Sequence, residues 1–333
     1  MIGRAAIIGC GIGGASTALA LAKIGARVEV YEASARSVEV GGWVTLGPAA
    51  STALDRLGLG EQVRHLGFPV VRVTTVDTIT GRVNSFARNE PGHRWPSTHV
   101  WRRDLLAVLR DRLEDVGVCC HYNVRAVPAD VAGDLVVGAD GARSATRRML
   151  GDLRKPTYTG QRICYGHHDL CAPGLPTGIL HFWTHPDGVV GYAGNDRDGS
   201  FWFSRRNAES PNVALGRDAF LEPLRDTPIA GVLELSEVSD PIALHELEPE
   251  GIWHTTDTVL VGDAAHAVSP AAGRGATSAI EDAIVLAKAV RDKGSIVAGL
   301  DVYTATRRPI ARATYRPRAG RPPTRVTAAE LEL

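Results

Sequence analysis

The sequence predicts an α/β fold in which a Rossmann-like dinucleotide-binding domain is assembled from separated segments, with a β-sheet-rich domain inserted between them. Three observations predict it. The segment GCGIGG, Gly9 to Gly14, follows an apolar run and precedes an Ala/Leu-rich stretch with helical spacing. Buried-strand patterns recur much later, at 134–139 and 258–262. Strand-like segments separated by turn sequences fill the stretch from 158 to 206.

A βαβ unit is expected at the start of the chain. Arg4 to Ile8 is a short apolar run that suits a buried parallel strand. A helix is expected from Ile12 to Ile24, because this stretch is rich in Ala and Leu and stops at Gly25. A second strand, Arg27 to Tyr31, ends beside Glu32.

The later elements follow from the same patterns. A helix is expected at 50–57, and apolar and polar residues alternate from Val70 to Phe86 around a turn at Thr80–Arg82, which predicts a hairpin. Further helices are expected at 102–113 and 275–291.

These elements divide the chain into three parts. The dinucleotide-binding domain is expected to comprise residues 1–65, 100–152 and 246–306, and the β-rich domain residues 66–99 and 153–245. Arginine and proline are concentrated in residues 307–333, which are therefore expected to form a solvated C-terminal tail.

The composition excludes several classes of partner. Lys+Arg and Asp+Glu both number 37 in 333 residues, so the formal net charge is +0 and no basic footprint for nucleic acid is expected. The five cysteines show no metal-ligand spacing, which favours a reduced, cytoplasmic setting and no metal. No uninterrupted apolar run reaches the ~18 residues of a membrane span.

The segment GCGIGG carries the dinucleotide-binding pattern. Gly9 permits a tight turn, Gly11 lets the backbone approach a pyrophosphate, and Gly14, next to Gly13, lets helix and strand pack closely. Glu32, at the end of the second strand, is placed to accept hydrogen bonds from adenosine ribose hydroxyls. The alternative is a glycine-rich strand-to-helix turn that holds no ligand.

Two later motifs extend this pattern: GADGARSATR at Gly138–Arg147 and GDAAHAVSPAAGRGATSAIEDA at Gly262–Ala283. Together with GCGIGG they resemble the DG and GD signatures of FAD-dependent aromatic hydroxylases, the class A flavoprotein monooxygenases of the p-hydroxybenzoate hydroxylase type, and of their epoxidase relatives. The resemblance covers most of residues 1–310. It implies an FAD-binding domain of the glutathione-reductase type and a β-rich substrate domain.

The resemblance implies contacts to FAD from the GD motif. Asp263 would bond the ribityl chain, and the segment from Pro270 would run past the isoalloxazine ring. Gly273 and Gly275 would let the backbone lie against that ring, and the following helix N-terminus would stabilise the negative charge of reduced flavin.

Other residues of these motifs carry alternatives. The resemblance implies that Asp140 helps to hold FAD, and the alternative is an aspartate that caps the next helix. Arg102 would lie near FAD, with Arg103 as a competitor for that role. His266 could be a general base, but the family uses this position structurally.

The substrate is expected where the β-rich domain meets the flavin. Trp43 follows a glycine pair in a loop that approaches the flavin in relatives. The residues expected to line the pocket are Trp43, His181, Trp183, Tyr192, Trp202 and Arg205. The alternative is that these aromatic residues belong to the core.

The resemblance also implies a reaction. NADPH or NADH would bind transiently and reduce FAD, and O2 would form a flavin C4a-hydroperoxide that hydroxylates or epoxidises an aromatic, polycyclic or otherwise unsaturated small molecule. No protein acid or base stands out, so the catalytic residues are unknown. The alternatives are another flavin reaction, such as Baeyer–Villiger oxidation or reduction, and a non-catalytic flavin- or nucleotide-binding remnant. The remnant is considered because the segment between Cys120 and Asp134 is short and Arg274 replaces the usual Gln.

Overall fold

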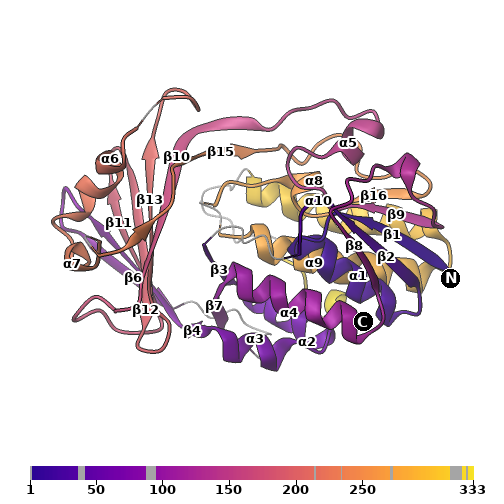
Figure 1. Ribbon diagram of the computed structural model, residues 1–333, viewed down its shortest axis with the longest axis horizontal. Coiled ribbons are helices and arrows are strands. Elements are labelled where there is room, and N and C mark those ends of the chain that lie inside the picture. Colours follow the sequence, from indigo (N-terminus) through magenta and orange to yellow (C-terminus); the bar gives the residue numbers. More distant parts are fainter. Residues whose placement is uncertain are drawn as a thin grey trace.

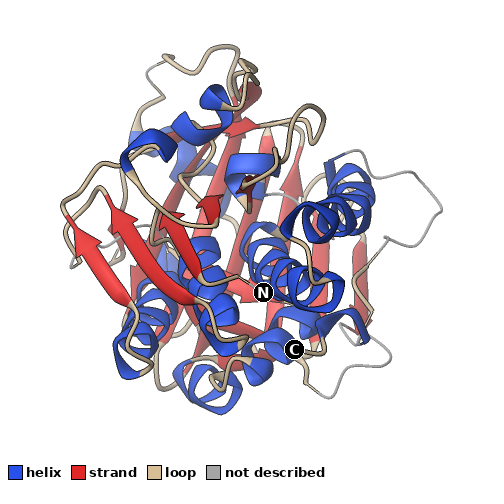
Figure 2. Cartoon of the chain, turned by 90° about the vertical axis from the view of Figure 1, so that its right-hand side faces the viewer, coloured by secondary structure: helices blue, strands red, loops and turns tan. Residues whose placement is uncertain are grey.

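The computed structural model describes residues 2–36, 42–87, 95–213, 215–233, 235–270, 273–315, 325–327 and 329–333. A parallel sheet with its helices forms one end of the molecule, and a large, mostly antiparallel sheet forms the other (Figure 1). A small three-stranded sheet lies between them. Both ends of the chain lie in the part that holds the parallel sheet (Figures 1 and 2).

The parallel sheet draws its strands from distant parts of the chain. Its order is β16-β9-β1-β2-β8, and all its neighbouring strands are parallel. The bounds are β1 (Arg4–Ile8), β2 (Arg27–Glu32), β8 (Cys119–Tyr122), β9 (Leu135–Gly138) and β16 (Thr258–Leu260). Residues 123–134 between β8 and β9 contain no strand. The predicted assembly of this domain from separated segments is confirmed.

Helices cover the parallel sheet and supply most of the larger core. They are α1 (Ile12–Lys23), α2 (Pro48–Arg56), α3 (Gly60–Leu66), α4 (Arg102–Asp115), α5 (Ala145–Met149), α8 (Asp263–His266), α9 (Gly275–Lys293) and α10 (Ile296–Tyr315), with short 3-10 turns η1 (Pro128–Asp130) and η4 (Ala329–Leu331). Helix α1 packs against α4 and α9, and it is buried from Ile12 to Leu21 except at Gly13. A helix that is apolar on all sides is expected to be buried in this way.

The small sheet connects the two larger parts. Its order is β3-β7-β4, all antiparallel, with β3 (Trp43–Leu46), β4 (Phe68–Val70) and β7 (Ser97–Trp101). Strand β7 leads directly into α4, which places Arg102 at the junction between the small sheet and the parallel-sheet domain.

The large sheet has the order β14-β10-β13-β12-β11-β5-β6, and β15 also pairs with β10. Strands β5 and β11 are parallel and the other neighbours are antiparallel. The bounds are β5 (Arg72–Asp77), β6 (Val83–Ala87), β10 (Thr157–His168), β11 (Ile179–His185), β12 (Gly188–Asn195), β13 (Gly199–Asn207), β14 (Glu237–Val238) and β15 (Ile242–Glu246). The predicted hairpin is confirmed as β5 and β6.

The two faces of the large sheet have different partners. The outer face packs beneath α6 (Arg217–Leu221), η2 (Glu222–Leu224) and α7 (Ala230–Leu233), where Trp202 joins one apolar core. The opposite, inner face packs on the small sheet, where Phe201 joins a second core. Because successive residues of a strand point to opposite faces, neighbouring residues of β13 belong to different cores.

The prediction of a solvated C-terminal tail from residue 307 is wrong for much of its described part. Helix α10 continues to Tyr315, and Val326 and Leu331 are buried in the core of the parallel-sheet domain. The concentration of arginine and proline suggested a solvent-exposed segment. Arg307, however, is buried and paired with two carboxylates. No helix among the described residues is long and apolar enough to cross a membrane.

Candidate active site

The glycines of the turn between β1 and α1 are required for different reasons. Gly9 has a φ of +100°, and a Cβ there would lie 2.4 Å from the Ala139 carbonyl oxygen. A Cβ on Gly14 would lie 1.9 Å from the Gly9 carbonyl oxygen, and one on Gly13 would lie 3.3 Å from a side chain of α9. A Cβ on Gly11 would meet no atom within 4 Å. Packing within the protein therefore requires Gly9 and Gly14, while the space beside Gly11 is open.

The N-terminus of α1 is open as well. Its N-cap residue is Gly11, which has no side chain to accept a hydrogen bond, and its first turn carries no acidic residue. The free N–H groups and the positive end of the helix dipole are therefore available to an anion. This arrangement suits a pyrophosphate.

Glu32 and Arg110 hold the same turn from both sides. The two carboxylate oxygens of Glu32 accept hydrogen bonds from the Cys10 N–H at 2.7 Å and the Ser34 N–H at 2.8 Å. Arg110 on α4 donates to the Cys10 carbonyl oxygen at 3.0 and 3.2 Å and to the Arg36 carbonyl oxygen at 2.6 Å. Arg110 was not among the site residues predicted from the sequence. It could have been found from the sequence, because it is an arginine on the apolar face of a predicted helix.

Asp140 makes the helix-capping contacts that were the alternative to a cofactor contact. Its Oδ2 accepts hydrogen bonds from the N–H groups of Ala145 and Thr146 at 2.8 and 2.9 Å, at the start of α5. Arg147 follows in the same motif and is buried. It donates to the Ala264 carbonyl oxygen at 2.8 Å, which joins the second motif to the third.

Asp263 is the first residue of α8 and follows Gly262 at the end of the β16 segment. Its side chain is exposed and makes no hydrogen bond within the described part of the chain. The surrounding protein nevertheless desolvates it and raises the pKa of its carboxyl group, while the charges of His266 and Arg102 lower that pKa. A carboxylate that solvent reaches can accept hydrogen bonds from a ligand.

A buried charged network holds the turn that carries Asp263. Asp282 on α9 accepts hydrogen bonds from the Gly262 N–H at 2.8 Å and from Arg307 Nε at 2.6 Å, and it lies 2.7 Å from His266 Nε2. Arg307 on α10 also donates to Glu281 at 2.8 Å. His266 is thus held by a buried carboxylate, which favours the structural interpretation over a general base.

The same pair predicts a pH-dependent stability. Burial, the largest single influence, would lower the pKa of His266, but the charge of Asp282 and its hydrogen bond to the ring together raise that pKa. The contribution of protonated His266 to stability is therefore complete below its ordinary pKa of about 6.5 and is lost as the pH rises through its raised pKa. We expect the free energy of unfolding in urea to fall from neutral to alkaline pH, and to fall less in a His266→Gln variant. An identical pH dependence in both proteins would contradict this.

The third motif continues to the start of α9. Pro270 and Gly273 are exposed, Gly273 has a φ of +59°, and residues 271 and 272 lie outside the described residues. Helix α9 begins at Gly275 without a side-chain cap or an acidic residue in its first turn. Arg274 donates to the buried Glu281 at 3.1 Å and so joins the charged network.

The first and third motifs meet at α9. A Cβ on Gly13 would lie 3.3 Å from the Ala279 Cβ, and one on Gly262 would lie 3.2 Å from the same atom. In addition, the Gly47 N–H before α2 donates to Thr277 Oγ1 at 3.0 Å. The open end of α1 and the turn of Asp263, far apart in the sequence, therefore lie around one helix.

The structure distinguishes the two arginines at the start of α4. The charge of Arg102 acts on the pKa of both Asp263 and Tyr165, and its Nε is buried without a partner in the described part of the chain. Arg103 instead lies 4.6 Å over the Trp101 ring. Arg102 is thus the arginine beside the Asp263 turn.

The prediction of a single substrate pocket is wrong for four of its six residues. Trp43 and Arg205 lie on the inner side of the large sheet, toward the small sheet. The other four lie on the outer face, in or beside the core under α6 and α7: His181, Trp183, Tyr192 and Trp202. Burial there raises the pKa of Tyr192 to about 12. Strand alternation explains the split, because Trp202 and Arg205 differ by an odd number of positions.

Aromatic residues that were not predicted from the sequence line the inner face. Trp43 stacks on His99 with ring centroids 4.9 Å apart, and Phe201 lies 6.1 Å from Trp43 and 5.9 Å from Tyr165. A Cβ on Gly42 would lie 2.7 Å from the Phe201 ring. The available signal was strand alternation, since Phe201 has the same parity as Arg205 on β13.

A family model described as an FAD binding domain matches residues 252–317. The chain is 28% identical to a 3-hydroxybenzoate 6-hydroxylase of Klebsiella oxytoca over 92% of this chain and 84% of that protein. It is 29% identical to an FAD-dependent urate hydroxylase of Mycolicibacterium vanbaalenii over 91% of this chain and 84% of that protein.

Solved structures share the fold. HpxO of Klebsiella pneumoniae, solved with FAD and uric acid, has a TM-score of 0.81 at 24% identity, covering 94% of this chain and 86% of HpxO. PqsL of Pseudomonas aeruginosa, solved with 2-aminobenzoylacetate, has a TM-score of 0.78 at 22% identity, covering 94% of this chain and 93% of PqsL. The arrangement of both sheets is therefore shared across most of each chain.

Proposed function

Because the chain belongs to the family of FAD-dependent aromatic hydroxylases and monooxygenases, we propose that it uses FAD, NADPH or NADH, and O2 to hydroxylate or epoxidise an aromatic small molecule. The observation that carries the proposal is a convergence around α9. The open N-terminus of α1 and the carboxylate of Asp263, which has no hydrogen-bond partner among the described residues, lie around this helix, and the inner face of the large sheet faces the same part of the molecule.

The residues present fit FAD. The open space beside Gly11 and the uncapped end of α1 would accept its pyrophosphate. The Glu32 carboxylate has lone pairs beyond those used in its two backbone contacts, and these could accept hydrogen bonds from the hydroxyls of the adenosine ribose. Asp263 would accept from the ribityl hydroxyls, and the N-terminus of α9 would stabilise negative charge on the reduced ring.

When bound, FAD would supply the redox chemistry by accepting a hydride from the nicotinamide and activating O2. The protein would orient the substrate against the ring and exclude water. The aromatic groups of the inner face, including Trp43, Phe201 and Tyr165, supply apolar walls for this purpose. None of the described residues near the proposed flavin site combines a free basic group with a partner that would activate it, so we assign no general base.

The proposal is tested on the purified protein. We expect visible flavin absorption, oxidation of NADPH or NADH that an aromatic substrate accelerates, and a product heavier than the substrate by one oxygen atom. A non-catalytic flavin-binding protein would keep the absorption bands but consume no NADPH or NADH across a broad panel of aromatic compounds. Absence of any flavin binding would contradict the proposal.

Asp263→Ala is expected to weaken FAD binding by about tenfold to a hundredfold, because a charged acceptor of a ligand's hydrogen bonds contributes about 1.5–3 kcal/mol. The variant should fold normally, since Asp263 makes no hydrogen bond within the described part of the chain. FAD titration followed by flavin fluorescence measures the effect. Asp257→Ala, at the opposite end of β16, is the matched control and should bind FAD like the parent. Equal affinities in both variants would show that the ribityl contact is misplaced.

A further inference from the structure

Two cysteines from distant parts of the chain meet at the glycine-rich turn. Cys10 lies within the turn between β1 and α1 and is buried, while Cys120 on β8 is half-buried. Both are free thiols, and their side chains are hydrogen-bonded to each other. The structure therefore holds two reduced sulfurs in contact, beside the open helix end that is the proposed pyrophosphate site.

The surroundings of the pair give the two thiols different roles. The hydrogen bond from Cys120 is the main cause that lowers the pKa of Cys10, and Arg110 lowers it further, while burial opposes both. The same hydrogen bond, together with burial, raises the pKa of Cys120. Cys10 is therefore the sulfur that more readily becomes a thiolate, and Cys120 keeps its proton. A disulfide forms when a thiolate acts as the nucleophile next to a second sulfur.

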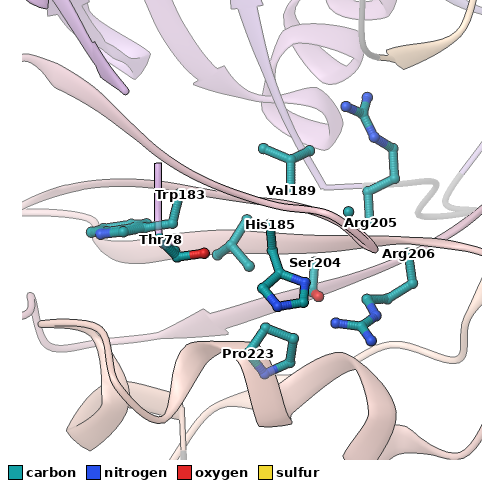
Figure 3. A pocket seen from close by; sticks show the side chains of 10 residues that line it. Thr78, Trp183, His185, Val189, Ser204, Arg205, Arg206 and Pro223 are labelled. Carbon is teal, nitrogen blue, oxygen red and sulfur yellow. The ribbon is translucent and has the colours of Figure 1, made fainter. Parts of the chain in front are cut away.

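Other cysteines of the chain stand in different surroundings. Cys164 on β10 lies opposite Ser204 of β13, whose hydroxyl lines the small cavity drawn in Figure 3. Cys119, the neighbour of Cys120 on β8, is exposed and its sulfur lies 3.5 Å from His121 Nε2. A hydroxyl thus stands opposite the first cysteine and an imidazole beside the second, whereas the pair at the turn brings sulfur to sulfur.

The backbone of Cys10 is part of the proposed cofactor site. Its N–H donates to Glu32 at 2.7 Å, and its carbonyl oxygen accepts from Arg110 at 3.0 and 3.2 Å. The next residue is Gly11, the N-cap of α1. A disulfide holds its sulfurs about 2.05 Å apart, much closer than two hydrogen-bonded thiols. Movement of the turn to close that distance would displace the groups proposed to hold the pyrophosphate and the ribose.

Resting on the proposed function, we propose that Cys10 and Cys120 form a modification site for peroxides, at which oxidation to a disulfide weakens FAD binding. With hydrogen peroxide, the Cys10 sulfur attacks one oxygen, so that an S–O bond forms and the O–O bond breaks. The hydroxide that leaves takes the proton released by Cys10 and becomes water.

The second step closes the disulfide. The Cys120 sulfur attacks the oxidised Cys10 sulfur, so that the S–S bond forms and the S–O bond breaks. The oxygen leaves with the Cys120 thiol proton as a second water. Each sulfur is oxidised by one electron, and the peroxide takes up both electrons.

FAD binding and disulfide formation are then linked. If the disulfide weakens FAD binding by a given factor, bound FAD disfavours the disulfide by the same factor, because such coupling is reciprocal. We expect the Kd of FAD to rise about tenfold on oxidation. In a glutathione redox buffer, saturating FAD should lower the equilibrium constant for disulfide formation by about the same tenfold.

The test starts from the reduced, full-length protein. Cleavage after lysine and arginine places Cys10 in residues 5–23 and Cys120 in residues 113–125. After treatment with hydrogen peroxide, mass spectrometry of the unreduced digest should detect these two peptides joined. FAD titration by flavin fluorescence should give an affinity that falls on oxidation and recovers with dithiothreitol.

Two serine variants on β8 form a matched pair. Cys120→Ser should bind FAD like the reduced parent and keep that affinity after peroxide treatment. Cys119→Ser should still give the joined peptides and lose affinity, and it removes the adjacent thiol that lies in the same peptide.

Three outcomes would overturn the inference: Cys119→Ser gives no joined peptides, the disulfide-linked protein binds FAD as tightly as the reduced protein, or peroxide weakens FAD binding equally in Cys120→Ser. Each is distinguishable from failure of the proposed function. The joined peptides are detected without FAD, while FAD binding and substrate-dependent NADPH oxidation are measured on the reduced protein without peroxide.

Discussion

Replacing Asp282 by alanine is expected to lower the free energy of unfolding by about 3–5 kcal/mol, the penalty for removing one partner from a buried ion pair. The variant would leave His266 and Arg307 buried without their shared carboxylate, and the Gly262 N–H without its acceptor. Urea unfolding of the flavin-free protein, followed by circular dichroism at neutral pH, measures the loss.

A second aspartate on α9 provides the matched control. Asp292 is exposed and pairs with Lys288 at 2.9 Å and Arg291 at 2.8 Å, contacts that lower its pKa to about 2. Exposed pairs of this kind contribute about 0–1 kcal/mol, so Asp292→Ala should unfold close to the parent. If Asp282→Ala cost no more than Asp292→Ala, the buried network would not stabilise the turn that carries Asp263.

Replacing Gly11 by valine should weaken FAD binding by about a hundredfold, or ~2.7 kcal/mol, without destabilising the flavin-free protein. The backbone at Gly11 is extended, with φ −75° and ψ −174°, and a Cβ there meets nothing within 4 Å, so the protein itself tolerates a side chain. That side chain would occupy the space proposed for the pyrophosphate. FAD titration and urea unfolding of the same preparations separate the two effects.

Gly14→Ala should show the reverse pattern. Its Cβ would collide with the Gly9 carbonyl oxygen, so the flavin-free protein should lose about 1–3 kcal/mol of stability, as overpacked sites do. Wild-type affinity for FAD in the Gly11→Val variant would exclude a pyrophosphate at the end of α1.

The turn of the first motif could be predicted from the sequence because it lies within a single βαβ unit. Gly14 and Glu32 act on Gly9 and Cys10 of the same unit, so their spacing carries the geometry. The contacts of Arg147 with Ala264 and of Arg307 with Asp282 join distant segments. The local sequence around either arginine does not identify its partner. Arg307 also lies in the segment that was predicted to be a solvated tail.

The amino-acid order alone was enough to specify a nucleotide-binding domain in separated pieces, because glycine spacing and apolar periodicity express local backbone geometry. It was not enough to select the surface that faces the flavin. Alternation along β13 shows that Arg205 and Trp202 lie on opposite faces, but it does not show which face meets the small sheet. Which face meets the small sheet depends on α6 and α7, which bury the opposite face. Packing between distant segments of this kind cannot be predicted from the sequence pattern of a single strand.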